Sequence, residues 1–178
     1  AAGGAWTLIS TTTISNDATI DLSLDNATYS SYMVFLEDIL PASDQVDMWM
    51  RFSTDGGSTF IATGYAHMNW GSDATGSIEY NKSESDSSIE MNPSSTANDH
   101  LSNAANETYS GVVFIHNPGS ASPTHANCQY SFENANGNYM FGSGGGWHST
   151  AQDTDAIQFM TSSGNLTSGT IKLMGLKS

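Results

Sequence analysis

Five histidines are the residues of this chain best suited to metal binding or acid–base chemistry. They are His67, His100, His116, His125 and His148, and no two of them lie within four residues of one another. Zinc-binding histidines commonly occur in closely spaced pairs, so this spacing does not indicate a zinc motif. His116 and His125 flank the turn segment NPGSASP and would face each other across a hairpin, either as two metal ligands or as ordinary strand-end residues. We predict no metal site.

The carboxylates are also not arranged in a catalytic pattern. Asp153 and Asp155 stand two residues apart, but the glycine turn and distal glutamate of a calcium loop do not follow them. Glu37 and Asp38 are neighbours at the end of a strand-like run, where they would point to opposite faces instead of forming a glycosidase pair. The glycines of Gly142–Gly146 lack the lysine that ends a phosphate-binding loop. We therefore predict a protein that is not an enzyme, with no catalytic residue and no cofactor.

A tryptophan on the outward side of a strand is a better candidate for function. In VDMWMRF, Trp49 is in phase with Asp47 and Arg51, opposite a row of apolar residues. It could lie under a neighbouring loop, or it could contact another subunit, because Trp and Arg are enriched in such contacts. Trp49 and Arg51 are candidate contact residues.

A second group of candidate contact residues surrounds the glycine-rich segment GSGGGWHS, which we expect to be a flexible surface loop. Trp147 and His148 belong to this segment, and Tyr139 begins the strand-like run before it. These side chains could anchor the loop or contact another subunit. They could also bind a glycan, because an aromatic ring stacks on the face of a sugar while amides hydrogen-bond its hydroxyls.

The charge balance excludes several classes of partner. The chain has 18 acidic and four basic residues among 178, for a formal net charge of −14. Nucleic acids and anionic membrane surfaces require clustered Lys or Arg, so we expect neither partner. The acidity would keep the protein soluble and discourage self-association. It would also suit salty water, where salt screens the repulsion between exposed charges. The single cysteine, Cys128, is in phase with Tyr130 and Phe132 and is predicted to be a small core residue. The first residue is alanine, which indicates a processed chain or part of a longer one.

Alternation of apolar and polar residues predicts an all-β protein with little or no helix. We expect one domain over residues 1–178, a single antiparallel β-sandwich of jelly-roll or immunoglobulin-like type with roughly ten strands. Ser31–Leu40 is apolar on both faces and should be a central strand that ends at Pro41. The segment Asp55–Gly57 predicts a hairpin turn, and the polar residues 80–108 predict a long excursion at one end of the sandwich.

The chain ends with DAIQFMTSSGNLTSGTIKLMGLK, which we interpret as a terminal hairpin. Together with WTLISTTTISNDATIDLSL, YMVFLEDILPASDQVDMWMRFSTDGGSTF and GVVFIHNPGSAS, this stretch resembles small β-sandwich virion proteins of tailed phages of marine bacteria and cyanobacteria. The resemblance covers nearly the whole chain, and its most specific parts are STDGGSTF and the terminal hairpin. Residues 78–109 are outside it.

The resemblance implies a structural component of a phage particle without catalytic residues. We expect a tail-fibre or receptor-binding module on the outer surface of the virion. The module would contact other virion proteins and form a rotationally symmetric homo-oligomer, such as a trimer. A capsid decoration or head-fibre protein is the alternative, and a carbohydrate-binding module that contacts host-surface glycan is a further one.

Overall fold

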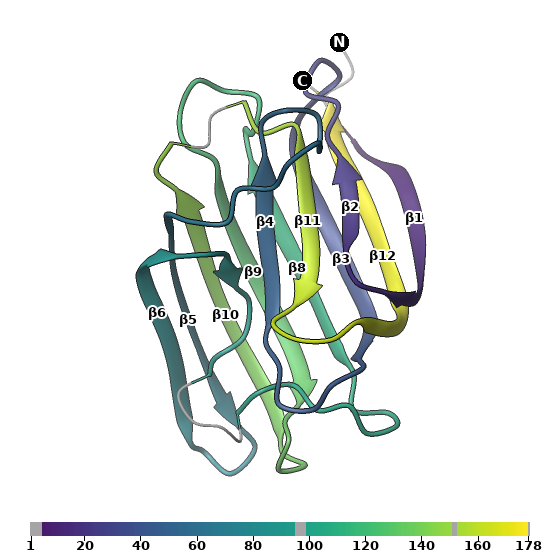
Figure 1. Ribbon diagram of the computed structural model, residues 1–178, viewed down its shortest axis with the longest axis vertical. Coiled ribbons are helices and arrows are strands. Elements are labelled where there is room, and N and C mark those ends of the chain that lie inside the picture. The colour runs from purple at the N-terminus through teal and green to yellow at the C-terminus, as the bar shows by residue number, and fades with distance from the viewer. Residues whose placement is uncertain (1–4, 95–98, 151–152, 178) are drawn as a thin grey trace.

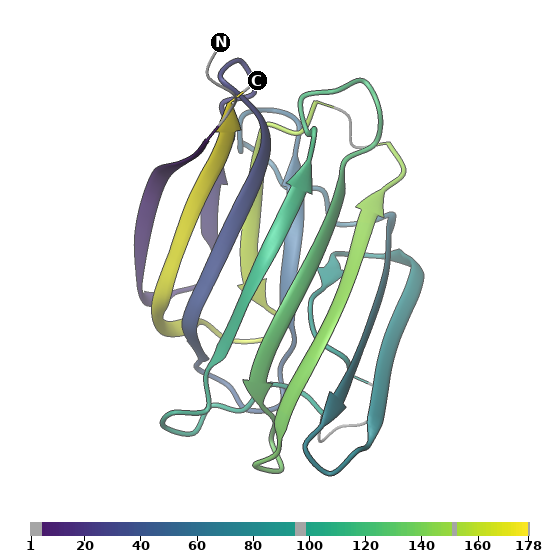
Figure 2. The same ribbon diagram turned by 180° about the vertical axis from the view of Figure 1, so that it is seen from behind.

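A computed structural model describes residues 5–94, 99–150 and 153–177. Its twelve strands form two antiparallel sheets that lie face to face (Figure 1). The large sheet contains, in spatial order, β1 (Trp6–Asp17), β12 (Leu166–Lys177), β3 (Tyr29–Pro41), β8 (Tyr109–His116), β9 (His125–Glu133), β10 (Tyr139–His148), β5 (Tyr65–Asp73) and β6 (Ile78–Asp86). The small sheet contains β2 (Ile20–Ser23), β11 (Ala156–Thr161), β4 (Met48–Ser53) and β7 (Ile89–Glu90). Seen from behind, the large sheet forms one continuous outer face (Figure 2).

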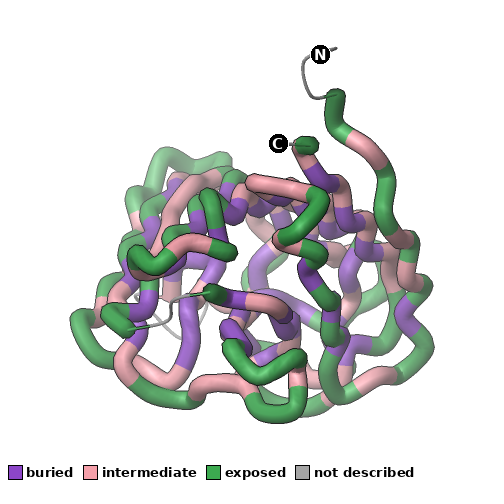
Figure 3. The backbone as a smooth tube through the Cα atoms, turned by 90° about the horizontal axis from the view of Figure 1, so that it is seen from above, coloured by how far each residue is buried: buried purple, intermediate pink, exposed green. Residues whose placement is uncertain are grey.

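The core lies between the two sheets, where alternate side chains of each strand point inward. Buried and exposed positions alternate along the strands when the sandwich is seen from above (Figure 3). The small sheet contributes Met48, Met50 and Phe52 from β4, and its central strand β11 is buried on both faces. The inward residues of the large sheet include Tyr32, Val34, Leu36, Tyr65, Val113, Ile115, Cys128, Tyr130, Phe132, Ile171 and Leu173.

The predicted fold class is confirmed, since the described residues form an antiparallel β-sandwich and contain no helix. The chain has twelve strands where roughly ten were expected. β3 lies inside the large sheet between β12 and β8 and ends at Pro41, as predicted. Among the described residues there is no helix with the length and hydropathy needed to cross a membrane.

The two predicted hairpins are wrong, because each turn connects different sheets. β11 belongs to the small sheet and β12 to the large one, so the segment around Gly164 arches across the core. Likewise, Gly56 and Gly57 adopt positive φ after β4, but the next strand, β5, is in the other sheet. Glycine meets the backbone requirement of both kinds of turn, so the turn sequence does not distinguish a hairpin from an arch.

The predicted glycine-rich surface loop is also wrong, because Tyr139–His148 is one continuous strand, β10. Its inward glycines are sites where other groups approach the backbone closely. A Cβ atom at Gly144 would lie 1.7 Å from Oδ1 of Asn69, and one at Gly142 would lie 2.5 Å from the hydroxyl of Tyr130. Glycine in a strand can mark such close packing as readily as a loop.

The expected polar excursion over residues 80–108 is corrected in its first part. Ile78–Asp86 is β6, the edge strand of the large sheet, and Ile89–Glu90 is β7, the edge of the small sheet. An edge strand with one face in solvent needs few apolar residues, and charged side chains protect it from pairing with other chains. This explains a strand of low hydrophobicity. Residues 95–98 of this segment lie outside the described part of the chain.

Substituting Gly144→Ala should lower the free energy of unfolding by about 2 kcal/mol or more, because overpacking a tight interior strains the backbone or displaces a neighbour. The displaced group would be Asn69, whose amide donates a 2.5 Å hydrogen bond to the carbonyl of Glu90. Urea denaturation measures the change. Ser143→Ala, the adjacent outward position, is the matched control and should be nearly neutral. Equal stability of the two variants would contradict this account of the glycines.

Candidate functional site

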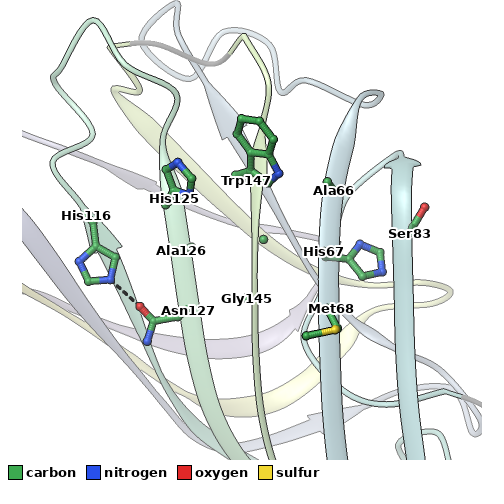
Figure 4. A pocket seen from close by; sticks show the side chains of 11 residues that line it. Ala66, His67, Met68, Ser83, His116, His125, Ala126, Asn127, Gly145 and Trp147 are labelled. Atoms are coloured by element: carbon green, nitrogen blue, oxygen red, sulfur yellow. Dashed lines mark hydrogen bonds between the residues drawn. The ribbon is translucent and has the colours of Figure 1, made fainter.

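The outer face of the large sheet contains a depression of about 500 Å³ near one end of β10 (Figure 4). It is lined by parts of β8, β9, β10, β5 and β6, and the residues are Ala66, His67, Met68, Ser83, His116, His125, Ala126, Asn127, Gly145, Gly146 and Trp147. We call it the β10 hollow. Ala and Gly at its floor leave the space that larger side chains would fill.

One wall of the β10 hollow is a pair of stacked rings. The antiparallel register places Trp147 opposite His125, and their rings are parallel to within 10° with centroids 5.4 Å apart. Because each ring restrains the other, the indole is held in one orientation at the rim. Trp147 remains 38% exposed and can offer a ring surface to a ligand.

Polar groups stand beside these rings. His116 is directly opposite His125 across β8 and β9, as the sequence predicted for this pair. Its ring does not join His125, however, but hydrogen-bonds through Nε2 with Oδ1 of Asn127 (Figure 4). This contact fixes the Asn127 side chain and leaves its amide nitrogen to donate to a ligand in the hollow. The two histidines therefore take different partners.

More aromatic side chains continue along the same outer face. A second depression of about 490 Å³ is lined by Trp70, Gln129 and Phe141 among other residues. Phe141 and Trp147 are both outward residues of β10, and a spacing of six residues corresponds to about 20 Å along a strand. The face can therefore contact an extended molecule at more than one point.

The outer face over β8, β9, β10 and β5 is almost free of charge, although the chain is strongly acidic and the neighbouring strand β6 carries Lys82 and Glu84. Within β8, β9, β10 and β5, which are described in full, Glu133 is the only carboxylate at an outward position. The remaining outward residues are aromatic, aliphatic, amide, hydroxyl or imidazole. Such a surface suits a neutral ligand that has both apolar faces and hydrogen-bonding groups.

The structure separates the three candidates around the glycine segment. Trp147 and Tyr139 are exposed on the outer face, at opposite ends of β10. His148 is buried instead, with Nε2 2.8 Å from the carbonyl oxygen of Thr63 and its ring against Tyr65 at 4.9 Å. His148 points inward because it follows Trp147 on a strand, so it is corrected to a core residue.

Trp49 and Arg51 lie on β4 of the small sheet, whereas the β10 hollow is on the outer face of the large sheet. Both are half-buried, and the guanidinium carbon of Arg51 is 5.9 Å from the centre of the Trp49 ring. Arg51 Nε also donates a 2.9 Å hydrogen bond to the carbonyl of Ser87. The segment between β6 and β7 therefore contacts Arg51. Trp49 and Arg51 stay candidate contact residues.

A group of ionisable residues that the sequence did not indicate lies at the β6–β7 edge of the sandwich. One nitrogen of His67 and one carboxylate oxygen each of Asp86 and Glu90 lie within 4.8 Å of one another. Burial, followed by the charges of Asp47 and Asp86, raises the pKa of Glu90 to about 7. In the sequence, the only signal was the spacing of Asp86 and Glu90, because His67 comes from a distant strand.

A separate ion pair lies close to this edge. Nδ1 of His100 is 2.7 Å from Oδ1 of Asp47, which also accepts a 2.8 Å hydrogen bond from the amide of Asn92. The hydrogen bond with Asp47 is the main reason why the pKa of His100 is raised above 6.5. Asp47, the residue before β4, is buried, although it is in phase with the outward residues of that strand.

The single thiol is not a candidate nucleophile. Cys128 is buried in the core as predicted, and burial raises its pKa to about 12. The thiolate, which is the reactive form, is therefore scarce at neutral pH.

Comparisons with known proteins do not assign a family. No family model matches the chain, and no curated protein matches it. Similar solved structures include the Caenorhabditis elegans galectin LEC-6, with 8% identity, a TM-score of 0.35 and coverage of 90% of this chain and 94% of the galectin. The CBM2 module of the evolved Dit of Lactobacillus casei BL23 phage J-1 has 7% identity, a TM-score of 0.31 and coverage of 93% and 75%. Scytalido-glutamic peptidase has 12% identity, a TM-score of 0.29 and coverage of 93% and 66%. At these scores, no functional argument depends on the likenesses.

The ion pair of His100 predicts a pH-dependent contribution to stability. Because its folded-state pKa is raised, the contribution is fully present below the unfolded value near 6.5 and is lost as pH rises through the folded value. His100→Gln should therefore lower the free energy of unfolding by about 1 kcal/mol at pH 5.5 and have little effect at pH 8.5. Urea denaturation at both values measures this.

Asp47→Asn provides the background for a control. In that background the same His100→Gln change should have a much smaller pH-dependent effect, because the hydrogen bond with Asp47 is the main cause of the raised pKa and only the weaker influence of Glu90 and Asp99 remains. A destabilisation by His100→Gln that is equal at both pH values would contradict the assignment.

Proposed function

We propose that this protein is a non-enzymatic glycan-binding module whose binding surface is the outer face of the large sheet, centred on the β10 hollow. The observation that carries the proposal is the stacked Trp147–His125 pair beside the Asn127 amide, at the rim of a depression of about 500 Å³. An aromatic ring held in place next to an oriented amide is the combination that a sugar ring requires.

The chemistry of a neutral sugar matches this surface in two respects. Its C–H face can stack on the exposed indole of Trp147, and its hydroxyls can bond with Asn127, His116 and neighbouring polar groups. Only one carboxylate lies at an outward position of β8, β9, β10 and β5. A neutral ligand bound there therefore does not have to bury an unpaired charge, which would cost free energy. The second depression around Trp70 and Phe141 suits an oligosaccharide longer than one residue.

The composition of the hollow also favours binding over hydrolysis. Glycoside cleavage usually requires two carboxyl groups on either side of the bond. Among the described residues that line the β10 hollow, none is Asp or Glu. The proposal is therefore a recognition surface, and the protein should leave bound oligosaccharides uncleaved.

We place this module on the surface of a phage particle, as a tail-fibre or receptor-binding component, with a capsid decoration protein as the alternative. The support is the sequence resemblance together with a surface that suits a host glycan. Cryo-electron microscopy of the particle distinguishes the two positions. Copy number does so as well, since a decoration protein should occur in hundreds per virion and a fibre in far fewer.

The proposed assembly on the virion is a homotrimer. Multi-angle light scattering of the purified chain should give three times the monomer mass of 18.9 kDa. A monomer at all concentrations would contradict self-association of the isolated chain and leave only contacts with other virion proteins.

Trp147→Ala should weaken glycan binding by at least tenfold, because it removes the stacking surface from the rim of the hollow. The measurement is binding to an array of neutral and acidic oligosaccharides, followed by calorimetric titration of the neutral oligosaccharide with the strongest signal. Trp6→Ala is a matched control, since Trp6 is also 38% exposed but lies on the edge strand β1, far along the sheet.

Two results would contradict the proposal. One is a native protein that binds no oligosaccharide on the array, and the other is binding that Trp147→Ala and Trp6→Ala weaken equally. Release of free sugar from the bound oligosaccharide would contradict the non-enzymatic part alone.

A further inference from the structure

His67 is a buried histidine without a hydrogen-bond partner. Its residue is 5% exposed, and neither Nδ1 nor Nε2 finds a partner among the described residues. A buried polar group of this kind normally has a partner, because leaving it unpaired costs free energy of desolvation. Figure 4 shows its ring directed from β5 toward β6, at the edge of the large sheet. An imidazole that is kept buried and unpaired is suited to bind something else.

Two carboxylates converge on this imidazole from other strands. Asp86 ends β6 and Glu90 ends β7, and one oxygen of each lies within 4.8 Å of a ring nitrogen of His67. Like charges at this separation repel, which is one cause of the raised pKa of Glu90. The fold thus brings two carboxylates, which attract positive charge, close to an imidazole nitrogen that has no hydrogen-bond partner.

The backbone of the fold holds these three groups in place. β5 and β6 are paired antiparallel, and an irregularity between the pairs His67–Ser83 and Tyr65–Asp86 places one extra residue on β6, so that Asp86 lies opposite Tyr65 and is partly buried. β7 is held at β4 by the pairing of Glu90 with Trp49, and the Asn69 amide donates to the Glu90 carbonyl. The Glu90 carboxylate accepts a hydrogen bond from the amide of Asn81 on β6. The donors are therefore fixed by three strands and not by one flexible loop.

We propose that His67, Asp86 and Glu90 bind a divalent transition-metal cation of the zinc type at the β6–β7 edge. One imidazole nitrogen and two carboxylate oxygens are a recognised ligand set for such ions. Calcium and magnesium favour shells made of oxygen and are less suited to an imidazole. In a tetrahedral zinc shell, neighbouring donor atoms are about 3.4 Å apart, so the three groups need only a small contraction. A fourth position remains for water.

The metal would join the two sheets at their open edge. His67 and Asp86 belong to the large sheet and Glu90 to the two-residue strand of the small sheet. Binding to the folded chain alone would raise the ratio of folded to unfolded protein about 100-fold when free metal is 100 times its dissociation constant. This proposal does not depend on glycan binding, because none of its expected results involves a sugar.

Titration of the metal-free protein with Zn²⁺ tests the proposal. We expect one equivalent per chain by isothermal calorimetry and a rise in the thermal unfolding midpoint. Co²⁺ should occupy the same site and give visible absorption that Zn²⁺ displaces. Asp86→Asn, Glu90→Gln and His67→Gln should each weaken binding by at least tenfold.

Matched controls separate this site from the exposed ionisable groups. Glu84→Gln removes an exposed carboxylate from the same strand, and His125→Gln removes an exposed histidine. Both should bind Zn²⁺ as the native chain does. Asp86→Asn keeps size and shape, so it remains informative if His67→Gln does not fold.

The proposal is overturned if the native protein binds neither Zn²⁺ nor Co²⁺ at one equivalent. It is also overturned if binding persists in folded Asp86→Asn and Glu90→Gln, or if His125→Gln abolishes it. The last result would place the ion at exposed histidines.

Discussion

The close approach of side chains to the glycine backbone of β10 is the constraint on which both candidate sites depend. Because Gly144 has no side chain, Asn69 fits against β10 and reaches across to the carbonyl of Glu90. That hydrogen bond links the large sheet to the backbone of β7, while Asn81 and Ser94 donate hydrogen bonds to the Glu90 carboxylate. On the other face of the strand, Gly145 leaves the floor of the β10 hollow open. A strand made of larger residues would remove both features.

The distribution of charge separates the faces of the sandwich. The chain carries a formal charge of −14, yet the outward residues of the four adjacent strands β8, β9, β10 and β5 include one carboxylate. Other acidic side chains occur in loops and at sheet edges, where water screens them, at the β6–β7 edge, where they converge on His67, or in an ion pair, as Glu37 of β3 does with Lys172 of β12. Repulsion between molecules then keeps the protein soluble while a neutral face stays available for contact.

Alternation along the chain was sufficient to predict the class of the fold, because inward residues such as Met48, Met50 and Phe52 recur with period two. Alternation could not assign the strands to sheets, because the arch at Gly164 contains the same types of turn residue as a hairpin. Exposure of Trp147 was expected and is found, but the stack with His125 depends on register between strands. The His67 cluster joins three strands, and no local pattern records such a meeting.

The two edges of the large sheet differ in a way that bears on assembly. Edge strands expose unpaired backbone groups, and charged side chains discourage pairing there with other chains. β6 carries Lys82, Glu84 and Asp86, so it is protected. β1 is mostly uncharged along its twelve residues and exposes Leu8 and the indole of Trp6. Contacts between copies are therefore favoured at the β1 edge, which keeps the β10 hollow and the β6–β7 edge, at the other side of the sheet, open to ligands.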